Sequence, residues 1–227
     1  MTIGIIVAMK KELNLLLPLI DDHNEVEVCG NVFHTGAIRG REIVVMQCGI
    51  GKVNAAIGAS TMIDRFAPSI IINSGVAGGA GAGAKVLDVV VAEHTAYHDV
   101  WCGPGCEWGQ VEGLPMYFDS DSSVLGLECL GKLGVKRGLI CSGDIFVSKV
   151  EELARIKSLF PEVIAVDMES APIAHTCYLR KVPFVSLRVI SDTPGEEDNI
   201  SQYANFWNDA PQHTFTVLNT IISNLDA

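Results

Sequence analysis

Short apolar runs rich in β-branched residues alternate along the chain with segments of helical character. One of the most apolar runs, residues 182–192, is too short for an isolated helix and has the composition of a buried strand. Strands that alternate with helices are typical of α/β proteins, in which helices cover both faces of a parallel or mixed sheet. The pattern therefore predicts a three-layer α/β/α sandwich around a central mixed, twisted sheet.

The expected elements follow one another without a linker, an internal repeat or a low-complexity tract, so residues 1–227 are predicted to form one domain. Strands are expected at residues 2–8, 25–36, 41–48, 70–72, 86–92, 137–142, 163–167 and 182–192. Helices are expected to begin at residues 10 and 51, the second ending near residue 65, and to cover residues 121–133, 149–158, 169–180 and 201–225. Residues 99–118 have little periodicity and are expected to form a long functional loop.

The formal net charge of −11 argues against nucleic acid or an anionic membrane surface as the main partner. No apolar stretch approaches the roughly 20 residues of a membrane span, and residues 1–8 resemble a first strand more than a signal peptide. The cysteines include one close pair, Cys102 and Cys106, without a second pair that would complete a zinc site. The chain is therefore predicted to act in the cytoplasm with reduced thiols, and without a metal or an organic cofactor.

Three acidic residues stand where an expected strand gives way to a turn or a helix: Glu12, Glu169 and Asp192. Ligands bind at the carboxyl ends of strands in open α/β sheets, so one edge could collect all three. An aspartate that keeps its proton in such a place could act as a general acid. Taken singly, Glu12 and Glu169 also fit ordinary first-turn helix acids, and Asp192 also fits an Asx turn before Pro194.

Two further segments at the same edge suit a planar ligand. Residues 74–79 follow a buried strand, and their glycines would let the backbone approach a ligand and offer N–H donors. Phe146 could offer an aromatic face to such a ligand, although a phenylalanine packed in the core fits its position equally well. Neither segment carries a Walker or dinucleotide fingerprint, so each alone is a weak signal.

Taken together, several motifs in this order resemble those of the purine nucleoside phosphorylase/nucleosidase superfamily, and most of all its 5′-methylthioadenosine/S-adenosylhomocysteine nucleosidase branch. The motifs are residues 4–12, 48–53, 71–79, 97–99, 142–146, 165–169 with 174–175, and 188–192. The resemblance covers nearly the whole chain. It implies that the partner is a small purine nucleoside, and that the protein hydrolyses the N-glycosidic bond of a 5′-substituted adenine nucleoside in methionine salvage.

The resemblance also implies a role for individual residues. Asp192 would give a proton or a strong hydrogen bond to N7 of the leaving adenine, and Glu12 would activate a water for attack on the anomeric carbon. Arg188 would orient Glu12 or that water. The implied substrate-binding residues are Glu169 and Met168 at the ribose, Phe146 and Val147 at the base, Ala77 and Gly78 through their backbone, Met9 and Ile50 at the sugar and 5′-substituent, and Tyr203 with Phe206 as aromatic covers.

The chain departs from the family pattern at several positions. Val76 stands where the family's glycine-rich loop carries serine, and Asp167 stands where the family carries glutamate. In the family, the loop equivalent to residues 101–115 completes the site of the neighbouring subunit, which implies a homodimer. In this loop, Pro104 and Glu112 replace the usual aromatic residue and proline, and Trp101 and Trp108 are candidates to compensate. An acidic Glu112 would favour a more polar 5′-substituent.

Three other functions fit parts of the same evidence. A nucleoside phosphorylase must bind phosphate, which the Glu12 carboxylate would repel and for which Val76 offers no hydroxyl. A nucleosidase for a futalosine-type nucleoside is left open by the altered loop. A non-catalytic nucleoside-binding protein would have no need of Glu12, Arg188 and Asp192 together, so hydrolysis is the favoured function.

Overall fold

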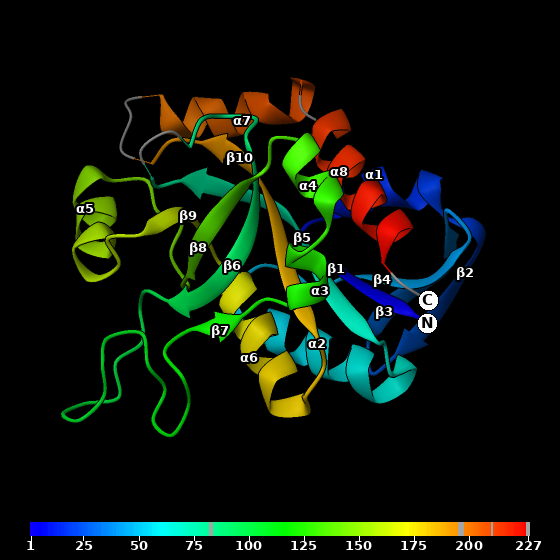
Figure 1. Ribbon diagram of the computed structural model, residues 1–227, viewed down its shortest axis with the longest axis horizontal. Helices are drawn as coiled ribbons and strands as arrows, with labels where there is room; N and C mark the ends of the chain where they lie inside the picture. The colour runs from blue at the N-terminus through cyan, green and yellow to red at the C-terminus, as the bar shows by residue number, and fades with distance from the viewer. Residues whose placement is uncertain (82–83, 195–197, 210, 226–227) are drawn as a thin grey trace.

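A mixed β-sheet with helices around it organises the chain (Figure 1). The computed structural model describes residues 1–227 except 82–83, 195–197, 210 and 226–227. The strands in this part of the chain are β1 (Ile3–Val7), β2 (Asp21–Val28), β3 (Asn31–Ile38), β4 (Arg41–Gln47), β5 (Ile70–Gly79), β6 (Val89–Tyr97), β7 (Phe118–Asp119), β8 (Lys136–Ser142), β9 (Val163–Asp167) and β10 (Phe184–Asp192). The helices are α1 (Lys10–Leu16), η1 (Leu17–Leu19), α2 (Lys52–Phe66), α3 (Ser122–Leu125), α4 (Glu128–Lys132), α5 (Val150–Leu159), α6 (Ser170–Arg180), α7 (Asn199–Asp209) and α8 (Pro211–Asn224).

The two halves of the sheet meet at β5, which pairs with β1, β9 and β10. On one side of it, β10, β6, β8, β9 and β5 pair in that order, and the β5–β10 pairing closes them into a ring. On the other side, β1, β4, β3 and β2 extend as an open sheet. One cluster of buried residues has members from every ring strand: Ala77, Val90, Ala92, Ile140, Ala165 and Ile190. Three of these six are alanines, whose small side chains let the ring strands pack closely together.

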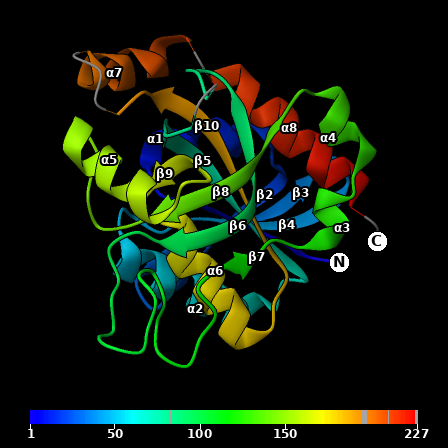
Figure 2. The same cartoon turned by 60° about the vertical axis from the view of Figure 1, so that its left-hand side comes forward.

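Helices cover the sheet on two sides, as Figures 1 and 2 show. Apolar residues of α1 and α8 pack with those of β1, β4 and β5 in one cluster, which includes Leu13, Leu16 and Ile221. Apolar residues of α2 and α6 pack on the opposite side in a second cluster, which includes Met62 and Ile173. The predicted fold class, a mixed, twisted sheet between helical layers, is confirmed. The closure of part of the sheet into a ring was not predicted.

Several element boundaries differ from the sequence expectations. The strand expected at residues 25–36 is a hairpin of β2 and β3, which turns at Cys29 and Gly30, both with positive φ. The strand expected at 86–92 begins and ends later, as β6. The helix expected at 121–133 is two short helices, α3 and α4, and the helix expected at 201–225 is α7 and α8, with residue 210 outside the described residues.

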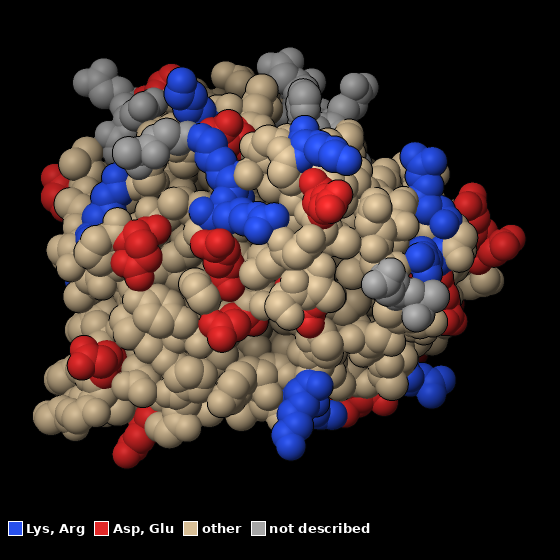
Figure 3. Space-filling view, viewed as in Figure 1, with Lys and Arg blue, Asp and Glu red and all other residues tan. Residues whose placement is uncertain are grey.

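The surface carries charges of both signs. In Figure 3, lysine and arginine side chains lie among acidic ones and uncharged surface, without forming a continuous basic stripe on this face. Such a stripe is the usual electrostatic footprint of nucleic-acid binding. In the described part of the chain, no helix combines the length and apolar character needed to cross a membrane.

Candidate active site

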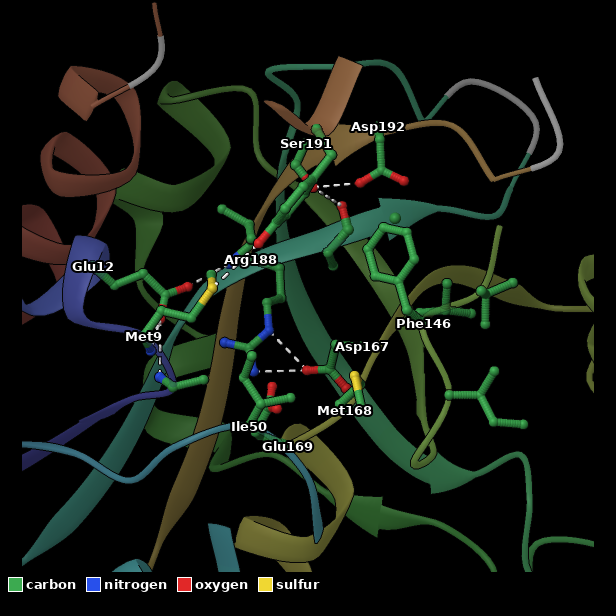
Figure 4. Close-up of a pocket in the computed structure, with 18 of the residues that line it drawn as sticks. Met9, Glu12, Ile50, Phe146, Asp167, Met168, Glu169, Arg188, Ser191 and Asp192 are labelled. Carbon is green, nitrogen blue, oxygen red and sulfur yellow. Dashed lines mark hydrogen bonds and ion pairs between the residues drawn. The ribbon is translucent and has the colours of Figure 1, made fainter. Parts of the chain in front are cut away.

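A cavity lies where β1, β5, β8, β9 and β10 give way to the segments that follow them (Figure 4). Its empty volume is about 660 Å³, a figure that includes the open mouth. Twelve of the thirteen site residues expected from the sequence line it, all except Phe206: Met9, Glu12, Ile50, Ala77, Gly78, Phe146, Val147, Met168, Glu169, Arg188, Asp192 and Tyr203. Residues from distant parts of the chain therefore line one cavity.

Glu12 occupies the first turn of α1, and its carboxylate is held by three backbone N–H groups. Oε2 accepts hydrogen bonds from the N–H groups of Ala8 at 2.9 Å and Met9 at 2.8 Å, and Oε1 accepts one from Val76 at 3.2 Å. Burial raises the pKa of Glu12, and the Arg188 charge and these hydrogen bonds oppose the rise. The carboxylate is thus fixed in position while it keeps a raised affinity for a proton, which suits a general base.

A glycine in β5 makes room for this arrangement. A Cβ atom at Gly75 would lie 2.7 Å from Oε1 of Glu12 and 3.1 Å from Nη1 of Arg188. Both side chains therefore rest against the β5 backbone at the same point, and any larger residue would displace at least one of them.

Arg188 is fully buried in β10, and its side chain donates hydrogen bonds to Asp167, Asn73 and, at 3.4 Å, the carbonyl of Leu187. Its Nε donates to Oδ2 of Asp167 at 2.8 Å, its Nη2 lies 2.7 Å from the same oxygen, and Nη2 also donates to Asn73. Asp167 in turn accepts hydrogen bonds from the hydroxyls of Ser142 and Ser170. The position of Arg188 is thus set by Asp167. The Arg188 charge acts electrostatically on Glu12, whose side chain meets that of Arg188 beside Gly75, and opposes the rise in the pKa of Glu12. The family resemblance implies that Arg188 orients Glu12 or a water molecule, and that role stays a prediction.

Glu169 is the residue just before α6, at the floor of the cavity, and is 6% exposed. Its Oε1 accepts a hydrogen bond from the N–H of Gly51 at 2.9 Å, which joins the start of α2 to the site. Burial and the nearby Asp167 charge raise the pKa of Glu169 to about 7, although Arg188 and the Gly51 N–H oppose this rise. The remaining carboxylate oxygen is the one available to a ligand.

Asp192 ends β10 and is 2% exposed. Burial raises the pKa of Asp192, while hydrogen bonds to its two oxygens oppose the rise. Ser191 donates to Oδ1 at 2.6 Å, and the amide of Asn199, from α7, donates to Oδ2. The turn after Asp192 comes so close to β5 that a Cβ atom at Gly78 would lie 2.6 Å from Pro194. The geometry therefore fixes the carboxyl group in place and gives it a raised pKa, as a proton donor requires.

Aromatic and sulfur-containing side chains form the walls between these acids. The rings of Phe146 and Tyr203 lie 5.5 Å apart at an interplanar angle of 68°, and the Tyr203 hydroxyl lies 3.2 Å from Sδ of Met9. Phe146 is 47% exposed, so its ring is not a core residue and is free to face a ligand. Two aromatic residues of α7, Tyr203 and Phe206, were expected to cover the site, and only Tyr203 lines the cavity. Phe206 instead packs in a buried cluster with Val189, against which Val76 also lies.

The long loop at residues 99–117 does not line the cavity of its own chain. Trp108 packs with the cluster around Phe160 and donates a hydrogen bond from its ring nitrogen to the carbonyl of His98 at 2.9 Å. Trp101 stacks on Trp108 and is 54% exposed, and Glu112 is exposed as well. Neither tryptophan therefore replaces a missing contact within the same chain's site.

The sequence did not reveal the residues that hold the acids in place. Asn73 follows three isoleucines in a buried strand, and this interruption by a polar residue was an available signal. Asn199 gave no such signal, because it reaches Asp192 only through the packing of α7 against β10. Ser191 adjoins Asp192 within the motif at residues 188–192, but the motif does not indicate that its hydroxyl binds the Asp192 carboxyl group.

Comparison with known proteins agrees with this geometry. The model of the phosphorylase superfamily matches residues 2–223. A curated relative from Actinobacillus succinogenes, a 5′-methylthioadenosine/S-adenosylhomocysteine nucleosidase, is 44% identical over 206 residues, which cover 88% of this chain and 90% of the relative. The crystal structure of the nucleosidase of the same name from Neisseria meningitidis, in complex with methylthio-immucillin-A, superposes with a TM-score of 0.93 at 38% identity, over 99% of each chain. A futalosine hydrolase mutant from Helicobacter pylori is similar with a TM-score of 0.91 at 30% identity, also over 99% of each chain.

The fold and the site together define an α/β protein of the nucleoside phosphorylase and nucleosidase class. The chain belongs to the phosphorylase superfamily and, within it, to the 5′-methylthioadenosine/S-adenosylhomocysteine nucleosidase family. The resemblance identified from the sequence motifs is thereby confirmed.

Proposed function

We propose that this protein hydrolyses the N-glycosidic bond of 5′-methylthioadenosine, S-adenosylhomocysteine and related 5′-substituted adenine nucleosides, releasing adenine. The observation that carries the proposal is the placement of two buried acids, Asp192 and Glu12, on different sides of one cavity, with Arg188 between them in Figure 4. A carboxyl group on each side of a scissile bond is what acid-assisted departure and base-assisted attack require.

The proposed reaction breaks the bond between the anomeric carbon and N9 of adenine. The electron pair leaves with the base, and Asp192 gives its proton to N7, so that adenine departs neutral. Glu12 takes a proton from a water molecule as the water oxygen bonds to the anomeric carbon. The products are adenine and the free 5′-substituted ribose. Charge builds up on base and sugar in opposite senses, so the transition state gains more than the ground state from both groups.

The remaining residues position the nucleoside in this scheme. The free carboxylate oxygen of Glu169 accepts hydrogen bonds from the ribose 2′- and 3′-hydroxyls, and Met168 packs on the sugar. Phe146 stacks on the adenine ring, with Val147 at its edge and Ala77 and Gly78 contributing backbone contacts. Met9, Ile50 and Tyr203 line the end of the cavity that takes the sugar and the 5′-substituent.

Hydrolysis is proposed over phosphorolysis because of the charge at the nucleophile position. A phosphate dianion would enter beside the Glu12 carboxylate, and Val76 packs its side chain towards Phe206 without offering a hydroxyl. The guanidinium of Arg188 faces Asp167 with two of its nitrogens, so its positive charge is already balanced. Because a futalosine hydrolase has the same fold, a futalosine-type nucleoside is a second candidate substrate. The substrate assay distinguishes it from the 5′-substituted adenine nucleosides.

The test is incubation of the purified chain with methylthioadenosine, adenosylhomocysteine, adenosine, inosine and a futalosine, each with and without phosphate. Free base and sugar products are separated by chromatography. We expect adenine from the first two substrates at a rate that phosphate does not change. Formation of a sugar 1-phosphate would show that the reaction is phosphorolysis and contradict the proposed hydrolysis. Release of base from futalosine alone would show that the substrate is futalosine and contradict the proposed substrates.

Nucleoside binding is expected to weaken as the pH falls through about 7, the pKa to which burial and the Asp167 charge raise Glu169. Only the ionised carboxylate accepts hydrogen bonds from two ribose hydroxyls, and protonation on the acid side removes an acceptor. KM should therefore rise below this pH, whereas a Glu169→Gln variant should show a raised KM without that dependence. The measurement is KM against pH for both proteins. A flat KM profile in the unmodified chain would contradict the assigned role of Glu169.

We further propose that the chain acts as a homodimer in which loop 101–115 of one subunit completes the site of the other. Val53 and Ile57 lie one turn apart on α2 and are 68% and 54% exposed, and Ile50 at the cavity mouth is 52% exposed. Lys52 pairs with Asp99 at 2.9 Å, which places the start of the long loop beside this apolar face. A second copy seated on α2 would cover the face and the mouth of the cavity, and would bring Glu112 of the loop towards the 5′-substituent.

The Ile57→Glu variant is expected to be monomeric in sedimentation velocity and to have a raised KM, because a charge would be buried at the centre of the subunit contact. The matched control is Val32→Glu, which alters a residue on β3 that is 43% exposed and, by strand alternation, faces away from Phe33, the neighbouring residue that packs against α2. A monomeric unmodified chain with full activity would overturn the proposed assembly.

We also propose a cytoplasmic location and a place in methionine salvage. All seven cysteines are free thiols, which fits a reducing compartment. Cell fractionation followed by the adenine-release assay tests the location, and activity outside the cytosolic fraction would contradict it.

A further inference from the structure

A second group of chemically active side chains lies on the β2–β3 hairpin, at the edge of the open part of the sheet. Glu25 of β2 is directly opposite His34 of β3 in the antiparallel register. His23 lies two residues before Glu25, in an irregular stretch where Asp22 has a positive φ of 52°. His23 and Glu25 share a face of the hairpin with His34, so that two imidazoles and one carboxylate meet.

The distances within this group suit a single cation. Nε2 of His23 lies 2.9 Å from Nδ1 of His34, and Nδ1 of His34 lies 3.5 Å from Oε1 of Glu25. The nearest ligand atoms of all three residues lie within 4.8 Å of one another. Bonds of about 2.0–2.2 Å in a tetrahedral zinc site place neighbouring ligand atoms about 3.3 Å apart. The three atoms therefore need only small side-chain adjustments to share one ion.

The surroundings favour a cation as well. His34 is 3% exposed, and its Nδ1 already faces both His23 and Glu25. β2 contains four acidic residues within its eight positions. Its first five residues are exposed, so a metal ion can reach the site from solvent. Glu25 places negative charge near the His34 ring, whereas Lys10 and a protonated His23 place positive charge near it.

We propose that His23, Glu25 and His34 form a binding site for a zinc-class divalent transition-metal ion, separate from the nucleoside site. Two imidazole nitrogens and a carboxylate oxygen are a ligand set that Zn²⁺ and its neighbours in the first row accept, with a water completing the coordination. In the metal-free form the two facing ring nitrogens share one proton. Binding requires that proton to move to the other nitrogen of its own ring, so no net proton is released from the pair.

A bound ion would link the edge strand β2 to β3 through side chains. The hairpin would then be stabilised in proportion to the metal concentration, because a ligand that binds only the folded state shifts the folding equilibrium towards it. The site lies at the far end of the sheet order from β10, so occupancy is expected to leave nucleoside hydrolysis unchanged.

The test uses the full chain after treatment with a chelator, in a Cys102→Ser/Cys106→Ser background that removes the close pair of loop thiols. Zn²⁺ is titrated by calorimetry, and Co²⁺ is titrated by absorption. We expect one ion per chain and a cobalt spectrum without the near-ultraviolet band of sulfur ligands. His23→Gln and Glu25→Gln should each weaken binding at least about tenfold, since even loss of an outer-shell partner typically costs this much.

The matched control is His94→Gln, which removes a histidine that pairs with one carboxylate, Asp119 at 2.8 Å, outside the hairpin. It should bind like the parent, and at equal Zn²⁺ concentration the melting temperature should rise more in the parent and this control than in Glu25→Gln. His34 is left unchanged because it is buried. Binding that is unaffected by His23→Gln, sulfur ligation in the cobalt spectrum, or no binding at all would each overturn the site.

Discussion

Replacement of Asp192 by asparagine is expected to reduce adenine release by about 10²–10⁴-fold, the usual contribution of a general acid. Asparagine has no acidic proton to give to N7, although it preserves the size of the side chain. Nucleoside affinity should stay within about tenfold, because the lost interaction belongs to the transition state more than to the ground state. The measurements are single-turnover rates of adenine release and binding of substrate by calorimetry.

The matched control for this variant is Asp198→Asn, which makes the same chemical change at an exposed position six residues further along. It should retain the parent rate. An Asp192→Asn protein that turns over at a near-normal rate would remove Asp192 from the role of proton donor. A protein that loses affinity and rate together would show a role in holding the base instead.

The Glu12→Gln variant is expected to lose turnover to a similar degree, about 10²–10⁴-fold, because an amide does not take a proton from water. Glutamine can still accept hydrogen bonds from Ala8 and Met9, but its NH₂ group would then face the N–H of Val76, which now donates to Oε1. The loss of that bond lowers stability as well, by about 1 kcal/mol for an ordinary hydrogen bond. Rate and thermal unfolding should therefore be measured on the same protein.

Glu151→Gln is the matched control, since Glu151 is also a first-turn helix glutamate, in α5, and is exposed. It should leave the rate unchanged. If Glu12→Gln kept the parent rate while Asp192→Asn lost it, water activation would have to be assigned to another group, and the pairing of acid and base across the bond would be wrong.

The strands that could be predicted are those whose side chains are buried on both faces. β10 is buried at all nine positions and β1 at all five, and both were expected from their apolar runs. β2 was missed in part because most of its side chains are exposed and polar, so it has no apolar pattern. Its turn, Cys29-Gly30, also lacks the Asn-Gly or Asp-Gly pair that usually marks a two-residue hairpin. The β5–β10 pairing is non-local, and no local pattern specifies it.

The candidate site could be predicted further than the fold details, because its three buried acids each stand in a recognisable motif near a strand end. The sequence brought Glu12, Glu169 and Asp192 to one edge, and the structure places all three around one cavity. The supporting contacts were out of reach. The hydrogen bond from Asn199 to Asp192 and the pairing of Arg188 with Asp167 depend on how elements pack, which spacing along the chain does not encode.

The alanine-rich interior of the β5–β10 ring has a consequence for how proteins of this kind diversify. Asp192 and Glu169 stand at or just after the ends of two of its strands, β10 and β9, so the ring sets the distance between the proposed leaving-group acid and the proposed sugar anchor. Ala77, Ala92 and Ala165 pack closely with the other buried residues of this cluster, so the spacing between the ring strands is fixed. Insertions and substitutions in the segments outside it can change which 5′-group is accepted while the reactive spacing is inherited intact. Changes in substrate preference are therefore expected in the loops, and residues that maintain the reaction are expected in the ring.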